Sequence, residues 1–167
     1  MKSIDVRELL DAPGTARRES IDEVCEDLRL ELEQVDGPVR GRLLLERVSE
    51  GVYVTGTLEW KATMSCARCL EQFGGDFESE ASGMFAVRPD EDSYPIAEQG
   101  DLDPEPLVRD TVLLAMPFAP LCREDCRGLC MRCGSNLNEG ACGCAEPAMD
   151  PRWAGLEAFI EPESSNN

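Results

Sequence analysis

The sequence predicts an α+β protein, in which an antiparallel β-sheet or half-barrel is followed by a helix and a C-terminal cysteine-rich module. Three observations carry this prediction. Apolar residues alternate with polar ones from residue 28 to residue 87, which is the period of strands with one buried face. Apolar residues take helical spacing after residue 103, and eight cysteines stand in four close groups. With 42% apolar residues among 167, the chain can bury a modest core.

Charge and composition exclude several functional classes. The 16 Lys and Arg residues face 34 Asp and Glu residues, so the net charge is −18 and the pI is near 4.3. An acidic surface repels phosphates, which argues against broad nonspecific nucleic-acid binding. There is no histidine, which excludes Ser-His-Asp and Cys-His catalysis and histidine metal ligands. No other catalytic group is evident, so we expect no enzyme.

The first 88 residues divide into an N-terminal segment, residues 1–25, and an antiparallel β domain, residues 26–88. A short helix from Asp5 to Leu10 is expected in the N-terminal segment. The β domain should hold about four strands. The predicted order is a strand at residues 28–32, a turn at residues 36–38, a strand at residues 39–48, a hairpin turn at residues 49–51, a strand at residues 52–64 and a strand at residues 73–87.

The strand over residues 52–64 has the clearest pattern in the chain. Its even positions, from Val52 to Met64, are mostly apolar, whereas its odd positions are mostly polar. One face of this strand should therefore lie in the core and the other in water. In the following strand Phe73, Phe77, Ala81, Phe85 and Val87 share one face.

The C-terminal half begins with residues 89–102, an acidic linker that we expect to be exposed and solvated; an acidic binding tail is the alternative. Residues 103–160 comprise a helix and the cysteine-rich module. Asp103 is the predicted N-cap, and Pro117 and Pro120 end the helix. A last short helix should start at Asp150-Pro151, and residues 161–167 should be a disordered tail.

The cellular compartment bears on how the cysteines are used. Residues 1–25 hold no apolar stretch typical of a signal peptide, and the longest apolar run, Val112 to Ala119, is too short to span a bilayer. We therefore expect a cytoplasmic protein. Thiols stay reduced in that compartment, so clustered cysteines bind metal more often than they form disulfides.

Eight of the nine cysteines form close-spaced groups, and Cys25 alone stands apart as a small buried apolar residue. The groups are Cys66-x2-Cys69, Cys122-x3-Cys126, Cys130-x2-Cys133 and Cys142-x-Cys144. Close spacing directs two thiolates at one ion, and eight thiolates suffice for two tetrahedral sites. Zinc is the expected metal because it accepts four sulfur ligands without redox chemistry; iron–sulfur clusters, and thiols without metal, are the alternatives.

Adjacency favours one site made of Cys130, Cys133, Cys142 and Cys144. The other site would then join Cys66 and Cys69 to Cys122 and Cys126, and would tie the sheet to the C-terminal module. Two further arrangements stay open: one joins Cys66 and Cys69 to Cys130 and Cys133, and the other fills a single site. All-cysteine ligation is typical of closed structural sites.

Four arginines, Arg68, Arg123, Arg127 and Arg132, lie within or beside these cysteine groups. Bases and acids balance over residues 120–145, so an RNA phosphate meets less repulsion here than elsewhere. These arginines are the candidate RNA or partner contacts. The alternative is that they bond to local carbonyls and acids.

The run from Pro120 to Cys144, with Ser65-Cys-Ala-Arg-Cys-Leu70 and Asp150-Pro-Arg-Trp153, resembles the bacterial YceD family. That family is described as needed for accumulation of large-subunit ribosomal RNA. The resemblance implies a ribosome-biogenesis role in synthesis, processing or stability of the large-subunit (23S) rRNA. Its expected partners are that rRNA, a basic ribosomal protein, or both. The alternative function is a redox-regulated zinc-thiolate chaperone or sensor.

Overall fold

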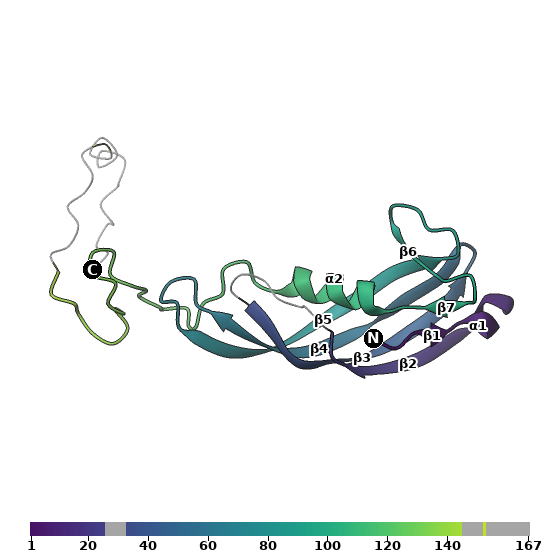
Figure 1. Ribbon diagram of the computed structural model, residues 1–167, viewed down its shortest axis with the longest axis horizontal. Coiled ribbons are helices and arrows are strands. Elements are labelled where there is room, and N and C mark those ends of the chain that lie inside the picture. The colour runs from purple at the N-terminus through teal and green to yellow at the C-terminus, as the bar shows by residue number, and fades with distance from the viewer. Residues whose placement is uncertain (26–32, 145–151, 153–167) are drawn as a thin grey trace, which may run out of the picture.

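The computed structural model describes residues 1–25, 33–144 and 152 (Figure 1). The elements, in chain order, are β1 (Ile4–Asp5), α1 (Arg7–Asp11), β2 (Ala16–Glu23), β3 (Glu33–Val48), β4 (Gly51–Ser65), β5 (Gln72–Ala86), β6 (Ser93–Pro95), β7 (Asp101–Leu102) and α2 (Glu105–Ala115). Strands dominate, and the predicted α+β class with a curled sheet is confirmed.

The main sheet has five strands in the order β2-β3-β4-β5-β6, and β1 pairs with β7 in a separate two-stranded sheet. All pairings are antiparallel except that between β5 and β6. The long strands β3, β4 and β5 run the length of the sheet, and α2 lies along one face of it (Figure 1). The β4–β5 turn lies at the end of the sheet far from α1, where the cysteine-rich segment approaches it (Figure 1).

The alternation predicted for β4 is confirmed. Val52, Val54 and Leu58 are fully buried, and Trp60, Ala62 and Met64 continue the same buried face. On β5, Ala81 and Phe85 are buried, whereas Val87 lies beyond the strand and is 53% exposed. The predicted hairpin turn between β3 and β4 is also present, since Val48 pairs with Gly51.

The turn predicted at Asp36-Gly37-Pro38 is wrong, because these residues lie inside β3 as a bulge. From Asp36 to Arg40 β3 advances four residues, while its partner β4 advances two, from Lys61 to Glu59. A β-bulge absorbs extra residues and increases local twist without reversing the chain. Gly37, with φ of 75°, supplies the left-handed backbone conformation that this bulge needs. The strand predicted at residues 28–32 lies outside the described residues.

Residues 16–23, which were predicted to lie within the N-terminal segment, form the edge strand β2. Their sequence is rich in charge, and Ile21 is the one residue of β2 that is buried. The pairing register joins Ala16 to Glu46 and Glu23 to Val39. A strand that contributes one core side chain shows little period-2 signal, so tertiary pairing decides its conformation. The expected N-terminal helix is present as α1, where Leu9 is buried.

We expected residues 89–102 to be an exposed linker, and the structure instead shows two short strands there. β6 continues the main sheet beyond β5, and β7 pairs with β1. Ile96 and Leu102 are buried in the main core. Tyr94 packs against Phe85, with ring centroids 5.0 Å apart. A few apolar residues therefore anchor a stretch whose composition is mostly acidic.

Helix α2 supplies the layer that covers the sheet. Its N-cap is Pro104 rather than the predicted Asp103, although the Glu105 N–H still donates to Asp103 Oδ1 at 2.9 Å. Leu107, Val108 and Val112 are buried against the sheet. After α2 the chain is extended, and the Pro120 carbonyl accepts a hydrogen bond from Ala67 N–H in the β4–β5 turn. This contact brings Cys122 to the turn that carries Cys66 and Cys69.

No helix in the described part of the chain is long and apolar enough to cross a membrane. The last predicted helix, from Asp150, and the tail at residues 161–167 lie outside the described residues, apart from Arg152.

Candidate metal centre

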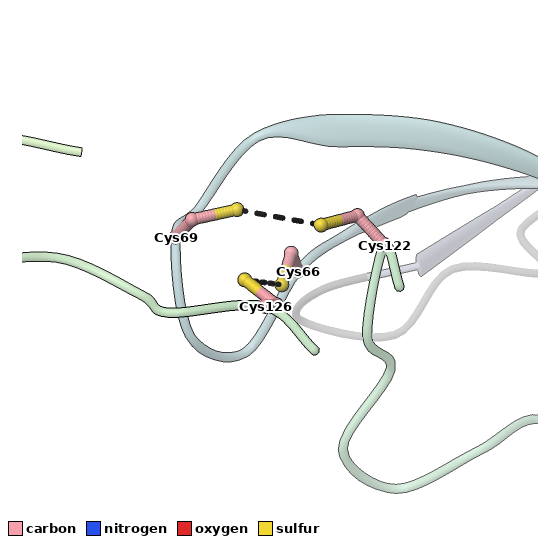
Figure 2. A group of neighbouring side chains, drawn as sticks. All are labelled: Cys66, Cys69, Cys122 and Cys126. Carbon is pink, nitrogen blue, oxygen red and sulfur yellow. Dashed lines mark hydrogen bonds between the residues drawn. The ribbon is translucent and has the colours of Figure 1, made fainter. Parts of the chain in front are cut away.

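The first group of thiols lies between the β4–β5 turn and the segment after α2. Cys66 and Cys69 come from the turn, and Cys122 and Cys126 come from the segment that passes beside it (Figure 2). The Sγ atoms of Cys66 and Cys126 are 3.7 Å apart, as are those of Cys69 and Cys122. Three of these four cysteines are buried, and they form a small apolar cluster with Phe73, Leu121 and Leu129. We call this group the inner site.

The second group, the outer site, consists of Cys130, Cys133, Cys142 and Cys144. Cys130 and Cys133 come from a turn, Cys142 and Cys144 come from an irregular stretch, and all four belong to the cysteine-rich segment. Cys133 and Cys144 are exposed. Cys25, by contrast, lies in the main core, as predicted for a small apolar residue.

The spacing of the sulfurs fits a tetrahedral metal ion. Within each group the four Sγ atoms all lie within 4.8 Å of one another. A disulfide would hold two sulfurs at about 2.05 Å. Zinc bonds to thiolates at about 2.3 Å, and tetrahedral geometry then separates the sulfurs by about 3.8 Å. Each group could therefore hold one metal ion, and the grouping is the one favoured by adjacency in the sequence.

Each site contains one turn, and the two turns have the same pattern of hydrogen bonds. Leu70 N–H donates to the Cys66 carbonyl at 2.9 Å, and Gly134 N–H donates to the Cys130 carbonyl at 2.8 Å. In both turns an arginine N–H, from Arg68 or Arg132, lies 3.5 Å from the Sγ of the first cysteine.

A second pair of hydrogen bonds closes each turn. The Cys66 N–H donates to the Glu71 carbonyl, and the Cys130 N–H donates to the Ser135 carbonyl. Both turns need a left-handed residue after the second cysteine, which is Gly134 at φ 73° in one and Leu70 at φ 63° in the other. The equal Cys-x2-Cys spacing is visible in the sequence, whereas the shared left-handed position is not, because residue 70 is Leu and residue 134 is Gly.

The thiols within each site have widely separated pKa values. Burial raises the pKa of Cys66, but N–H donors from Cys122, Cys69 and Arg68 outweigh it and bring that pKa to about 6. Burial and the neighbouring thiols Cys69 and Cys126 raise the pKa of Cys122 to about 12. The last thiol resists ionisation because the others already carry negative charge, and a bound cation would remove that penalty.

The pKa values of the outer-site thiols are separated in the same way. Hydrogen bonds with the Ser135 side chain and backbone, and with Cys130, lower the pKa of Cys133 to about 6. Contacts with Cys133 and Cys142 raise the pKa of Cys144 to about 12. Both donor sets are therefore suited to a cation that favours thiolates.

The four candidate arginines fall into two kinds. Arg68 bridges the inner site, because its Nη1 donates to the Cys126 carbonyl at 2.9 Å and to the Glu124 carbonyl at 3.5 Å. Arg123 donates to Asn138 Oδ1 at 2.8 Å and pairs with Asp125 at 3.3 Å.

Arg127 and Arg132 are both exposed. In the described part of the chain their guanidinium groups have no protein partner, and their contacts are made by their backbone N–H groups. The alternative role, bonding to local carbonyls and acids, is thus observed for Arg68 and Arg123.

Sequence reasoning missed Asn138 as a member of the site. Its Nδ2 donates to Cys126 Sγ at 3.4 Å, and its Oδ1 accepts hydrogen bonds from Arg127 N–H and the Arg123 guanidinium. Hydrogen bonds to ligand atoms orient them and tune their charge. The run Ser135–Gly140 is rich in turn-forming residues, and no local signal in it points to a thiolate 12 residues away.

These features define a class of protein: a curled β-sheet with a covering helix, extended by a segment with two four-cysteine sites that could each hold a metal ion. The chain belongs to the YceD family, since the model of the large ribosomal RNA subunit accumulation protein YceD matches residues 54–160.

Several proteins are similar to this chain. An uncharacterized protein of Mycobacterium tuberculosis is 36% identical over 175 residues, which cover 97% of this chain and 83% of that protein. An uncharacterized protein of Mycobacterium leprae is 35% identical, over 75% of this chain and 61% of its own length. The chloroplastic large ribosomal RNA subunit accumulation protein YCED homolog 1 of Arabidopsis thaliana is 23% identical, over 71% of this chain and 47% of its own length. No solved structure matches the chain.

Proposed function

We propose that this chain is a non-enzymatic ribosome-biogenesis factor that supports synthesis, processing or stability of large-subunit rRNA. It would bind that rRNA, a basic ribosomal protein, or both. Family membership supports the role, because the family is named for large ribosomal RNA subunit accumulation. We further propose that zinc occupies both sites and that all eight grouped cysteines are its ligands.

The observation that carries the proposal is the exposure of the Arg127 and Arg132 side chains. Both are exposed beside four-cysteine sites, and within the described residues neither guanidinium is used by the protein itself. A backbone fixed by metal and by the Asn138 hydrogen bonds lowers the ordering cost of binding a phosphate or an acidic group. Zinc held by four thiolates contributes structure and no open ligand position, so no catalytic step is assigned to it.

The experiment compares these two arginines with two exposed arginines of the main sheet. The double variant Arg127→Gln and Arg132→Gln should keep its zinc and its fold, and should associate less with large-subunit rRNA. In cells that lack the native protein it should restore less of that rRNA. The matched control replaces Arg18 and Arg42, two exposed arginines of the main sheet, by Gln. Full rRNA restoration by the double variant, with zinc retained, would refute this role for the two arginines.

A second function, redox regulation, is favoured by the exposure of the outer site. Cys133 and Cys144 are exposed, whereas three of the four inner-site cysteines are buried. Exposed thiolates react with oxidants more readily than buried ones. If the chain is a sensor, mild peroxide should release zinc from the outer site and expose apolar surface. Retention of zinc under mild peroxide would exclude the sensor function.

A further inference from the structure

The β5 strand has a long open edge. On one side β5 pairs with β4 from Gln72 to Phe85. On the other side it pairs with β6 only from Met84 to Ala86. Within the described residues, no strand covers the remaining edge, residues 72–83. An open edge offers its free N–H and C=O groups to any extended chain that comes alongside.

A groove follows this edge, between β5 and α2. It has a volume of about 300 Å³, and its lining includes Ser79, Glu80 and Ser82 of β5 and Leu107, Asp110 and Leu114 of α2. Leu114 is 86% exposed, although the opposite face of α2 is buried in the core. An exposed leucine beside a free strand edge is the kind of apolar position that a docked segment covers.

The charge along the edge is negative. Asp76, Glu78 and Glu80 occupy the solvent face of β5, and Asp110 faces the same groove from α2. Lys61 pairs with Asp76 at 3.3 Å. Among the described residues, no Lys or Arg forms an ion pair with Glu78 or Glu80. Glu78 lies directly opposite Glu59 of β4, and like charges in that position destabilise a sheet unless a cation joins them.

We propose that the β5 edge and the α2 groove together form a docking site for an extended protein segment in which Lys or Arg alternates with apolar residues. The segment would add a strand beside residues 76–82. Because side chains alternate between faces, its basic residues would meet Glu78 and Glu80, and its apolar residues would reach the groove at Leu114. The inference rests on the proposed function, and it names the chemical class of the protein partner. The same carboxylates repel RNA.

Charged edges also serve to prevent unwanted strand pairing, so the experiment has to separate docking from protection. The probe is an acetylated peptide of about ten residues with alternating Lys and Val. A second peptide has the same sequence but carries N-methyl groups on alternate amides, which removes backbone donors and keeps the charge. Binding to the full chain is measured by fluorescence anisotropy, and backbone protection is measured by hydrogen exchange.

We expect the unmodified peptide to bind, to protect residues 74–83 from exchange, and to bind at least about tenfold more tightly than the N-methylated peptide. The variant Glu78→Lys with Glu80→Lys should weaken binding about tenfold, and Leu114→Glu should weaken it as well. The matched control, Glu50→Lys with Glu98→Lys, makes the same charge change at exposed positions away from the edge and should leave binding within about threefold.

Three results of the peptide experiment would each overturn the inference: equal weakening by the control pair, equal binding of the N-methylated peptide, or no protection of residues 74–83. Binding of large-subunit rRNA, measured with the same variants, would overturn it if Glu78→Lys with Glu80→Lys weakened RNA binding and left peptide binding intact. If the peptide fails to bind, the result of the Arg127 and Arg132 test in cells still stands. Conversely, a failed arginine test with normal peptide binding would remove the rRNA contact and keep the docking site.

Discussion

At the scale of single residues, the inner site depends on a hydrogen-bond partner that is not itself a candidate ligand. Asn138 joins Cys126 Sγ to the backbone of Arg127 and the side chain of Arg123. It also donates to Asn136 Oδ1, and the Asn136 side chain in turn reaches Glu71 beside the β4–β5 turn. These two amides therefore link the two halves of the inner site to the loop between the two cysteine pairs of the outer site.

We predict that Asn138→Ala weakens zinc binding at the inner site by about tenfold, because loss of a hydrogen bond to a ligand typically has an effect of that size. It should also lower the free energy of unfolding by about 1–3 kcal/mol, since the Arg127 N–H loses its acceptor. Competition with a chromogenic chelator and denaturant unfolding measure the two effects. Glu139→Gln, at the exposed neighbouring position, is the control and should change neither. An Asn138→Ala protein with unchanged zinc affinity would show that this hydrogen bond is dispensable.

At the scale of elements, a phenol connects β6 to α2. Tyr94 OH donates to Asp110 Oδ2 at 2.7 Å, and the Tyr94 ring packs on Phe85 of β5. Burial, together with the hydrogen bond to the Asp110 carboxylate, raises the pKa of Tyr94 to about 12. This link holds the acidic segment after β5 against the helix that covers the sheet.

The raised pKa of Tyr94 determines how the stability of the fold changes with pH. A phenol with a pKa near 10 when unfolded and about 12 when folded contributes stability below pH 10, and this contribution is lost as the pH rises towards 12. The chain has two tyrosines, so Tyr53→Phe leaves Tyr94 as the only one. Its ultraviolet titration should then show a midpoint near 12, and adding Asp110→Asn should move that midpoint towards 10. A midpoint of about 10 before Asp110 is changed would contradict this account.

At the scale of the whole molecule, the residues that the structure describes form two separate apolar cores. The larger one lies between the sheet and α2 and includes Leu43, Leu58 and Val108. The smaller one consists of the inner-site cysteines and a few apolar neighbours at the far end of the sheet. Because the second core is so small, we infer that metal rather than apolar burial stabilises it.

Removing zinc should therefore affect the two regions unequally. Structural zinc contributes on the order of 10 kcal/mol to small modules, so chelation should strongly accelerate hydrogen exchange in residues 66–71 and 120–144. Residues 52–58 of β4 should keep their protection, because their side chains lie in the larger core. Cys66→Ser should have the same effect at the inner site, whereas Cys25→Ser, outside both sites, should leave the zinc content unchanged. Uniform acceleration along the whole chain would indicate a single cooperative unit.

The sequence by itself determined the features that depend on local pattern. The alternation along β4 predicted its buried face, and the spacing of eight cysteines predicted two groups that the structure brings together. The motif from Pro120 to Cys144 indicated the family. In each case the information lies in neighbouring residues, because side-chain period and ligand spacing are properties of a short segment.

Tertiary structure alone decided the remaining features. Strand β2 exists because β3 offers it an edge, and Gly37 forms a bulge rather than a turn because the chain continues along β4. The four arginines look alike in sequence, yet Arg68 reaches carbonyls about 56 residues away, whereas Arg132, at the same position of the repeated turn, has no such partner among the described residues. Contacts between segments that are distant in the sequence decide these features. A local sequence pattern contains no information about the free energy of such contacts.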